Sequence, residues 1–74
     1  MMQATVNAVV DIALVLVRLW YTSTDSMSAH DLHRIIRKIT TDLLGYEQET
    51  PERTIIESKA LVHLAEVYHI ETGW

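Results

Sequence analysis

The run of residues from Ala4 to Tyr21 (ATVNAVVDIALVLVRLWY) most constrains how this chain can fold. When the run is drawn as an α-helix with about 100° per residue, its polar residues fall in one narrow stripe. The stripe consists of Gln3, Asn7, Asp11 and Arg18, spaced 4, 4 and 7. The remaining apolar arc spans roughly 200°, twice the width of an ordinary core-facing stripe. We therefore expect this helix to need more than one neighbour.

Three other structures for the same run have less support. Its β-branched residues suit a buried strand, but 18 residues without Gly or Pro exceed the usual strand length. A transmembrane helix would carry Asp11 near its centre, at a cost of several kcal/mol. A signal peptide needs a basic start, and no Lys or Arg precedes Arg18. A soluble helix over about residues 3–22 is therefore the preferred interpretation, and we do not expect a membrane partner.

The composition favours one small domain over residues 1–74. A chain of 74 residues is close to the size at which a single core gives only marginal stability. It contains no cysteine, which excludes disulfides and cysteine-based metal sites and fits a cytoplasmic location. Because 49% of the residues are hydrophobic, a shared interface between copies is a natural supplement to the core.

A second helix is predicted over residues 29–44. Ser28 suits the N-cap position, and Asp31 follows three residues later, close to a capping box. Gly45 can adopt the left-handed conformation that ends helices. This helix is amphipathic, with a basic outer face.

A third helix is predicted over residues 51–71. Thr50 suits the N-cap, and Pro51 the first helical position, where the missing N–H costs nothing. Gly73 is expected to close the helix. Together these elements predict an all-α protein, a small three-helix bundle in which the first helix is strongly apolar and central.

The width of the apolar arc also predicts a homodimer, because two neighbours within one chain would cover only part of it. The residues expected at the dimer interface are Val6, Val9, Ala13, Leu16, Val17 and Trp20.

Asp11 and Arg18 leave two alternatives open. They lie seven residues apart on one stripe, so they face the same way without touching. If the stripe faces water, they are solubility charges. If it meets a partner helix or a twofold axis, Asn7, Asp11 and Arg18 would set the register, and the charge pair would form between chains.

The basic face of the second helix is the candidate surface for another partner. We expect partner contacts from His30, His33, Arg34, Arg37, Lys38 and Trp74. The face could be merely solvated, could dock on an acidic protein, or could contact phosphates. Nucleic acid is the weaker choice because residues 47–74 hold two basic and six acidic residues, for 2 − 6 = −4.

No arrangement of side chains predicts a metal, a cofactor or catalysis. His63 and His69 lie about 120° apart around their helix, too far to converge with Glu66 on one ion. We expect His63 to lie at the edge of the core with a hydrogen-bonded ring, and the other histidines in solvent. The chain also has no Gly-rich loop and no Gly-x-Ser-x-Gly motif.

These features predict a small non-catalytic protein–protein interaction module. Such a protein would act as an adaptor, regulator or inhibitor of a larger protein, as a homodimer. The alternative is a nucleic-acid-associated regulator that uses the basic face of the second helix. Neither alternative identifies the larger partner.

Overall fold

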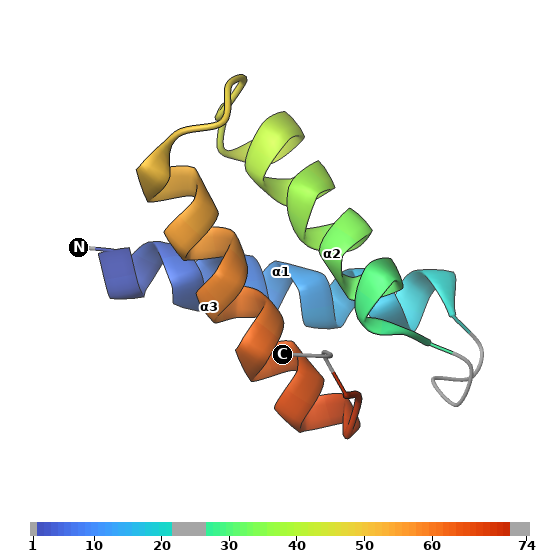
Figure 1. Cartoon of the computed structure of the whole chain (residues 1–74). Helices are drawn as coiled ribbons and strands as arrows, with labels where there is room; N and C mark the ends of the chain where they lie inside the picture. Colours follow the sequence, from blue (N-terminus) through green and yellow to red (C-terminus); the bar gives the residue numbers. More distant parts are fainter. Residues whose placement is uncertain (1, 22–26, 72–74) are drawn as a thin grey trace.

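Three α-helices and one π-helical turn make up the computed structural model, which describes residues 2–21 and 27–71 (Figure 1). In chain order the elements are α1 (Met2–Trp20), α2 (Ala29–Lys38), the π-helix η1 (Ile39–Leu43) and α3 (Pro51–Tyr68). No strand occurs within the described ranges. The all-α, three-helix prediction is therefore confirmed.

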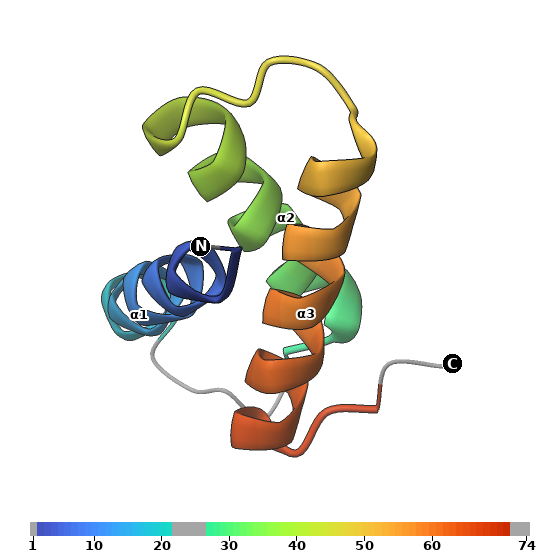
Figure 2. The ribbon, with the colours of Figure 1, turned by 90° about the vertical axis from the view of Figure 1, so that its left-hand side faces the viewer.

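The helices α2 and α3 form a hairpin, and α1 lies across one side of it. The two hairpin helices run in opposite directions, and each packs against α1. Figure 2 looks almost along α1 and shows the hairpin on one side of it only. The opposite side of α1 is therefore left without a neighbour in the described chain.

The core fills the space between these three helices. It is built from apolar side chains that are almost completely buried, contributed by every helix. Its members on α1 are Val6, Val9, Val10, Ala13 and Val17; those on α2 and η1 are Leu32, Ile35, Ile36 and Ile39; those on α3 are Ile56, Ala60, Leu61, Leu64 and Ala65. Small residues such as Ala13 and Ala60 allow the helices to approach closely.

The start of α2 follows the predicted capping box. The Asp31 backbone N–H donates to the Ser28 hydroxyl over 3.3 Å, and the Ser28 backbone N–H donates to the Asp31 carboxylate over 3.0 Å. Two amides that would otherwise lack partners at the helix start are thus satisfied.

The second helix does not continue as an α-helix to its predicted end at residue 44. From Ile39 onward it widens into a π-helix, in which the Leu44 N–H donates to the Ile39 carbonyl over 3.2 Å. The Tyr46 N–H then donates to the Thr40 carbonyl over 2.9 Å. Gly45 has φ +77°, the left-handed conformation predicted for it.

The third helix starts as predicted but ends earlier. Thr50 caps its start by accepting a hydrogen bond from the Arg53 N–H over 3.1 Å. It ends at Tyr68, because His69 adopts the left-handed conformation with φ 55° and Ile70 N–H donates to the Ala65 carbonyl over 2.8 Å. This Schellman motif forms on a histidine, four residues before Gly73, which lies outside the described residues.

Candidate functional site

A groove of about 600 Å³ lies between α2 and α3. One wall comes from α2 and the other from α3, and the loop before α3 closes one end. It is lined by Ala29, His30, His33, Arg37, Glu49, Thr54, Glu57, Ser58 and Leu61. The lining combines imidazole, guanidinium, carboxylate and hydroxyl groups with a larger area of apolar atoms.

The structure brings together three of the six residues predicted to contact a partner. His30, His33 and Arg37 line the groove, while Arg34 and Lys38 are exposed on α2 without lining it. Trp74 lies outside the described residues.

Two of the cations on this surface have acidic partners within the chain. Arg37 Nη1 lies 2.9 Å from Glu49 Oε1, and Lys38 Nζ lies 3.2 Å from Asp42 Oδ2. All four side chains are about half exposed, so each pair contributes little to stability. These two ion pairs reduce the positive charge that α2 presents to solvent. Among the three basic residues of this face in the described chain, Arg34 alone has no ion pair.

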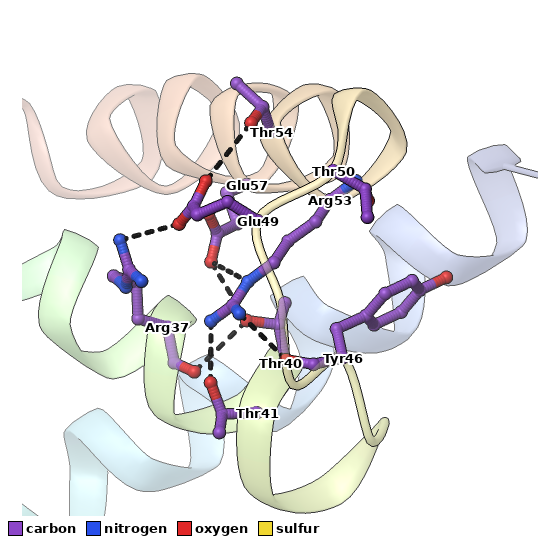
Figure 3. A network of polar contacts seen from close by, with 9 residues as sticks. All are labelled: Arg37, Thr40, Thr41, Tyr46, Glu49, Thr50, Arg53, Thr54 and Glu57. Atoms are coloured by element: carbon purple, nitrogen blue, oxygen red, sulfur yellow. Dashed lines mark hydrogen bonds and ion pairs between the residues drawn. The ribbon is translucent and has the colours of Figure 1, made fainter.

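The floor of the groove leads to a buried ion pair between Arg53 and Glu57 (Figure 3). Their side chains are only 3% and 6% exposed, and Arg53 Nε donates to Glu57 Oε2 over 3.2 Å. The pair lies one helical turn apart on α3. Such a pair is stable in the interior only if its remaining polar atoms also find partners.

Side chains and backbone from η1 and the next loop supply these partners. Arg53 Nη1 donates to the Tyr46 carbonyl over 2.8 Å, and Nη2 donates to the Thr41 hydroxyl over 2.6 Å. The Thr40 hydroxyl lies 2.9 Å from Glu57 Oε2 and 3.1 Å from the Arg37 carbonyl, and its single proton serves one of them at a time. No buried side-chain N or O atom in the described residues is left without a partner.

The π-helix contributes to this network through two consecutive residues, Thr40 and Thr41. The wider turn lets two consecutive threonines reach one ion pair on α3. The network therefore joins η1, the loop and α3, and it fixes the wall of the groove.

The sequence patterns did not lead to a prediction of this network, although the positions of Arg53 and Glu57 around α3 contained a signal. Arg53 and Glu57 fall on the same side of α3 as Ile56, Ala60 and Leu64, in the middle of the apolar arc. The charge count over residues 47–74 includes Glu57 but takes no account of its position around the helix. An oppositely charged pair at i, i+4 within an apolar arc indicates a buried ion pair.

Most of the residues predicted at the dimer interface are used inside the monomer. Val6, Val9, Ala13 and Val17 are at most 3% exposed and pack against α2 and α3. Leu16 is half-buried, and Trp20 is 49% exposed. The physical reason is that the hairpin covers only one half of the apolar arc, the half that carries Val9, Ala13 and Val17, so a second chain would meet the other half of the arc.

The uncovered apolar surface of α1 lies beside the polar stripe. Val15 is 55% and Leu19 72% exposed, and the Ala4 and Ala8 side chains are also exposed. Asn7, Asp11 and Arg18 border this surface and face solvent; the Gln3 amide donates to Asn7 Oδ1 over 3.0 Å. The prediction that the chain's own helices leave part of the arc uncovered is confirmed.

The helix α1 also resembles a membrane span in length and composition. Its residues Gln3–Trp20 have a mean hydropathy of 1.4, and 28% of them are buried in the fold. The core helix of a soluble protein can have the same length and hydropathy. Length and hydropathy alone therefore do not assign α1 to a membrane.

The histidines do not converge. His63 is exposed rather than placed at the edge of the core, which corrects the prediction for it; His33 is half-buried, and His30 and His69 are exposed. Among residues 2–21 and 27–71, no group of three or more His, Asp or Glu side chains is arranged to hold a metal ion.

Two groups near the ends of α2 and α3 have shifted pKa values. Hydrogen bonds from Ser28, the backbone N–H first, lower the pKa of Asp31 below its ordinary value of 3.8. Desolvation and the hydrogen bond that the Tyr46 hydroxyl donates to Glu52 over 3.2 Å raise the pKa of Tyr46 above 10.0. Both shifts belong to capping and loop contacts.

Comparison of this chain with protein-family models, curated proteins and solved structures finds no match.

Proposed function

We propose that this chain is a small non-catalytic protein–protein interaction module. It acts as an adaptor, regulator or inhibitor of a larger protein, in the cytoplasm, and it works as a homodimer. The observation that carries this proposal is the uncovered outer face of α1. On this face Val15 and Leu19 are 55% and 72% exposed, although a chain of 74 residues has few apolar side chains with which to build its core.

Apolar side chains exposed to water are unfavourable in free energy, and an interface that buries them removes this cost. Burying apolar surface contributes about 25 cal/mol per Å², and contiguous exposed apolar patches mark interaction sites. The outer face runs along α1, a helix of 19 residues, so its length is about 28 Å. A helix of that length is enough for a helix-to-helix interface.

The groove between α2 and α3 supports a second contact, with the larger protein. His30 and His33 present ring nitrogens along one wall, and Ser58 presents a hydroxyl group along the other, whereas Arg37 and Thr54 already contact Glu49. A polar segment that hydrogen-bonds to the two imidazole rings and to the Ser58 hydroxyl matches this lining. The buried network beneath holds this surface in one shape, which reduces the entropy lost on binding.

A nucleic-acid regulator has less support. The positive charges of Arg37 and Lys38 are already offset by Glu49 and Asp42, at 2.9 and 3.2 Å. Phosphate binding depends on the number of cations available to replace counterions. Binding that weakens steeply with salt and disappears with Arg34→Glu would favour this alternative.

Site-specific photo-crosslinking tests the interaction with a larger protein. A photoreactive amino acid at position 33, in the groove, should give discrete adducts heavier than a self-dimer in extracts of the source cells. The same amino acid at position 48, replacing the exposed Gln48 in the loop, is the matched control.

The interaction is specific if Arg34→Glu combined with Arg37→Glu abolishes the adducts from position 33 while the helical circular dichroism is unchanged. Identical adduct patterns from positions 33 and 48 would contradict the proposal.

A further inference from the structure

We propose that the outer face of α1 binds a second copy of this chain in antiparallel orientation, about a twofold axis that passes between Ile12 and Val15. This inference rests on the self-association in the proposed function and specifies its geometry. It follows from the spacing of the exposed apolar residues and from the placement of two charges beside them.

Four residues on the outer face have the spacing of a coiled-coil seam. Ala8, Ile12, Val15 and Leu19 are separated by 4, 3 and 4 residues; Ala8, Val15 and Leu19 are exposed, and Ile12 is half-buried because it also packs against the edge of the core. This alternation of three and four keeps one side of a helix facing a partner helix. Figure 2 shows nothing from the hairpin on the outward side of α1.

The spacing of 4, 3 and 4 residues is the same whether the helix is followed from its N-terminus or from its C-terminus. A twofold axis midway along the seam therefore places Ile12 against the partner's Val15 and Ala8 against the partner's Leu19. The second contact joins a small and a large side chain, which fills space evenly. Both contacts occur twice because of the symmetry.

The charges beside the seam complement each other only in this orientation. Asp11 and Arg18 immediately precede Ile12 and Leu19, so both lie along the same edge of the seam, exposed to solvent. Within one helix they are about 10 Å apart along the axis and do not pair. In the antiparallel dimer, Asp11 and the partner's Arg18 are offset by two residues, about 3 Å, within reach of an arginine side chain.

The parallel arrangement is disfavoured by the same residues. In a parallel twofold dimer, the edge that carries Asp11 and Arg18 would face the other edge of the partner helix, which carries the apolar Leu16, so neither charge would meet an opposite charge. A lipid surface would accept the apolar residues but would leave both charges at its edge without partners. A second copy satisfies the apolar seam and both charges together.

The first measurement is the mass of the full-length protein by light scattering over a hundredfold dilution. We expect a dimer that dissociates on dilution. Val15→Glu should raise the dissociation constant at least tenfold while the helical circular dichroism at low concentration is unchanged, because Val15 is not part of the core. Glu66→Gln, an exposed substitution on α3, is the control.

Charge reversal then tests the orientation. Asp11→Arg or Arg18→Asp alone should weaken dimerisation roughly fivefold, because each creates two repulsive contacts. The double variant Asp11→Arg/Arg18→Asp should restore the dissociation constant of the natural sequence. In a parallel dimer the two charges would not meet across the seam, so the single reversals would have little effect and the double variant would show no recovery.

A distance measurement gives an independent test, since the sequence has no cysteine of its own. A spin label on Ala4→Cys, an exposed position beside the seam, should lie about 30 Å from the partner's label in the antiparallel dimer and roughly 10 to 15 Å in a parallel one.

A dimer with the short label distance, or without recovery in the double variant, overturns the antiparallel arrangement and leaves the proposed function intact. A chain that stays monomeric at every concentration overturns the arrangement together with the self-association. If that monomer floats with neutral phospholipid vesicles, the outer face belongs to a membrane surface.

Discussion

The buried Arg53–Glu57 ion pair makes stability sensitive to the residues at these two positions of α3. Each charge is almost fully buried, and the contacts of the pair lie within α3 or reach η1 and the following loop. A buried ion pair adds little by itself, because desolvation offsets the attraction, but a buried charge that has lost its partner is strongly destabilising. The pair therefore constrains which sequences can adopt this hairpin.

Glu57→Gln tests this constraint. Because it leaves the buried guanidinium without a counter-charge, we expect the free energy of unfolding to fall by about 3 to 5 kcal/mol. Glu66→Gln, which changes an exposed glutamate on the same helix, should change it by less than about 0.5 kcal/mol. Urea denaturation followed by circular dichroism measures both. Equal effects of the two substitutions would mean that Glu57 is not held in the buried pair.

A double-mutant comparison separates the pair from its neighbours. Arg53→Met/Glu57→Leu removes both charges, so it should be less destabilising than the single Glu57→Gln substitution, in spite of the partners lost by Thr40 and Thr41. The free energies of unfolding of the three variants, measured in one buffer, decide this. A double variant that is less stable than the single one would show that the hydrogen bonds to η1 outweigh the charge term.

Asp31 predicts how stability depends on pH in acid. Its pKa is lowered in the folded state by the Ser28 hydrogen bonds, so its stabilising effect is present above about pH 4 and is lost as the pH falls through the lowered value. We expect Asp31→Asn to reduce the slope of unfolding free energy against pH below pH 4. Denaturation curves at pH 5, 4 and 3 measure it, with Glu71→Gln as the control. Unchanged slopes would argue against the capping box in solution.

At the scale of the elements, local signals predicted the starts of α2 and α3 well. Ser28 with Asp31, and Thr50 with Pro51, act through hydrogen bonds within one helical turn, so the neighbouring sequence determines them. The π-helix and the early end of α3 could not be predicted in this way. The first depends on a buried pair on another helix, and the second requires a non-glycine residue, His69, in a left-handed conformation.

Gly45→Ala tests the junction after η1. Gly45 has φ +77°, and a Cβ built there would meet nothing within 4 Å, so the strain would come from the backbone alone. We expect a loss of about 1 kcal/mol in the free energy of unfolding. Gly45→Asn should cost less, since asparagine tolerates this conformation better. Thermal denaturation compares the two, and equal losses would contradict the backbone explanation.

At the scale of the whole molecule, α1 has two apolar sides with different roles. Periodicity alone predicted that the arc was too wide for the chain's own helices, and this was correct. It could not show which part of the arc the hairpin would cover, because that depends on how α2 and α3 pack against α1. Four residues predicted at the dimer interface therefore lie in the core, while Val15 and Leu19 lie outside it.

A matched pair of substitutions distinguishes the two sides. Val9 is fully buried and Val15 is 55% exposed, and both lie on α1, so Val9→Ala and Val15→Ala remove the same atoms from opposite sides of one helix. In dilute solution, Val9→Ala should lower the free energy of unfolding by roughly 2 kcal/mol, the loss expected for two buried methyl groups and a small cavity. Val15→Ala should change it by less than about 0.5 kcal/mol.

The melting temperatures of the two variants should depend differently on protein concentration. A dimer stabilises the folded state by mass action, so the melting temperature of the natural sequence should rise with protein concentration. Val15→Ala should weaken this rise, because it removes contact area from the outer face, whereas Val9→Ala should lower the melting temperature at every concentration by a similar amount. Calorimetry over a hundredfold range measures both effects. If both variants retained the full concentration dependence, the outer face of α1 would not be the surface on which two copies meet.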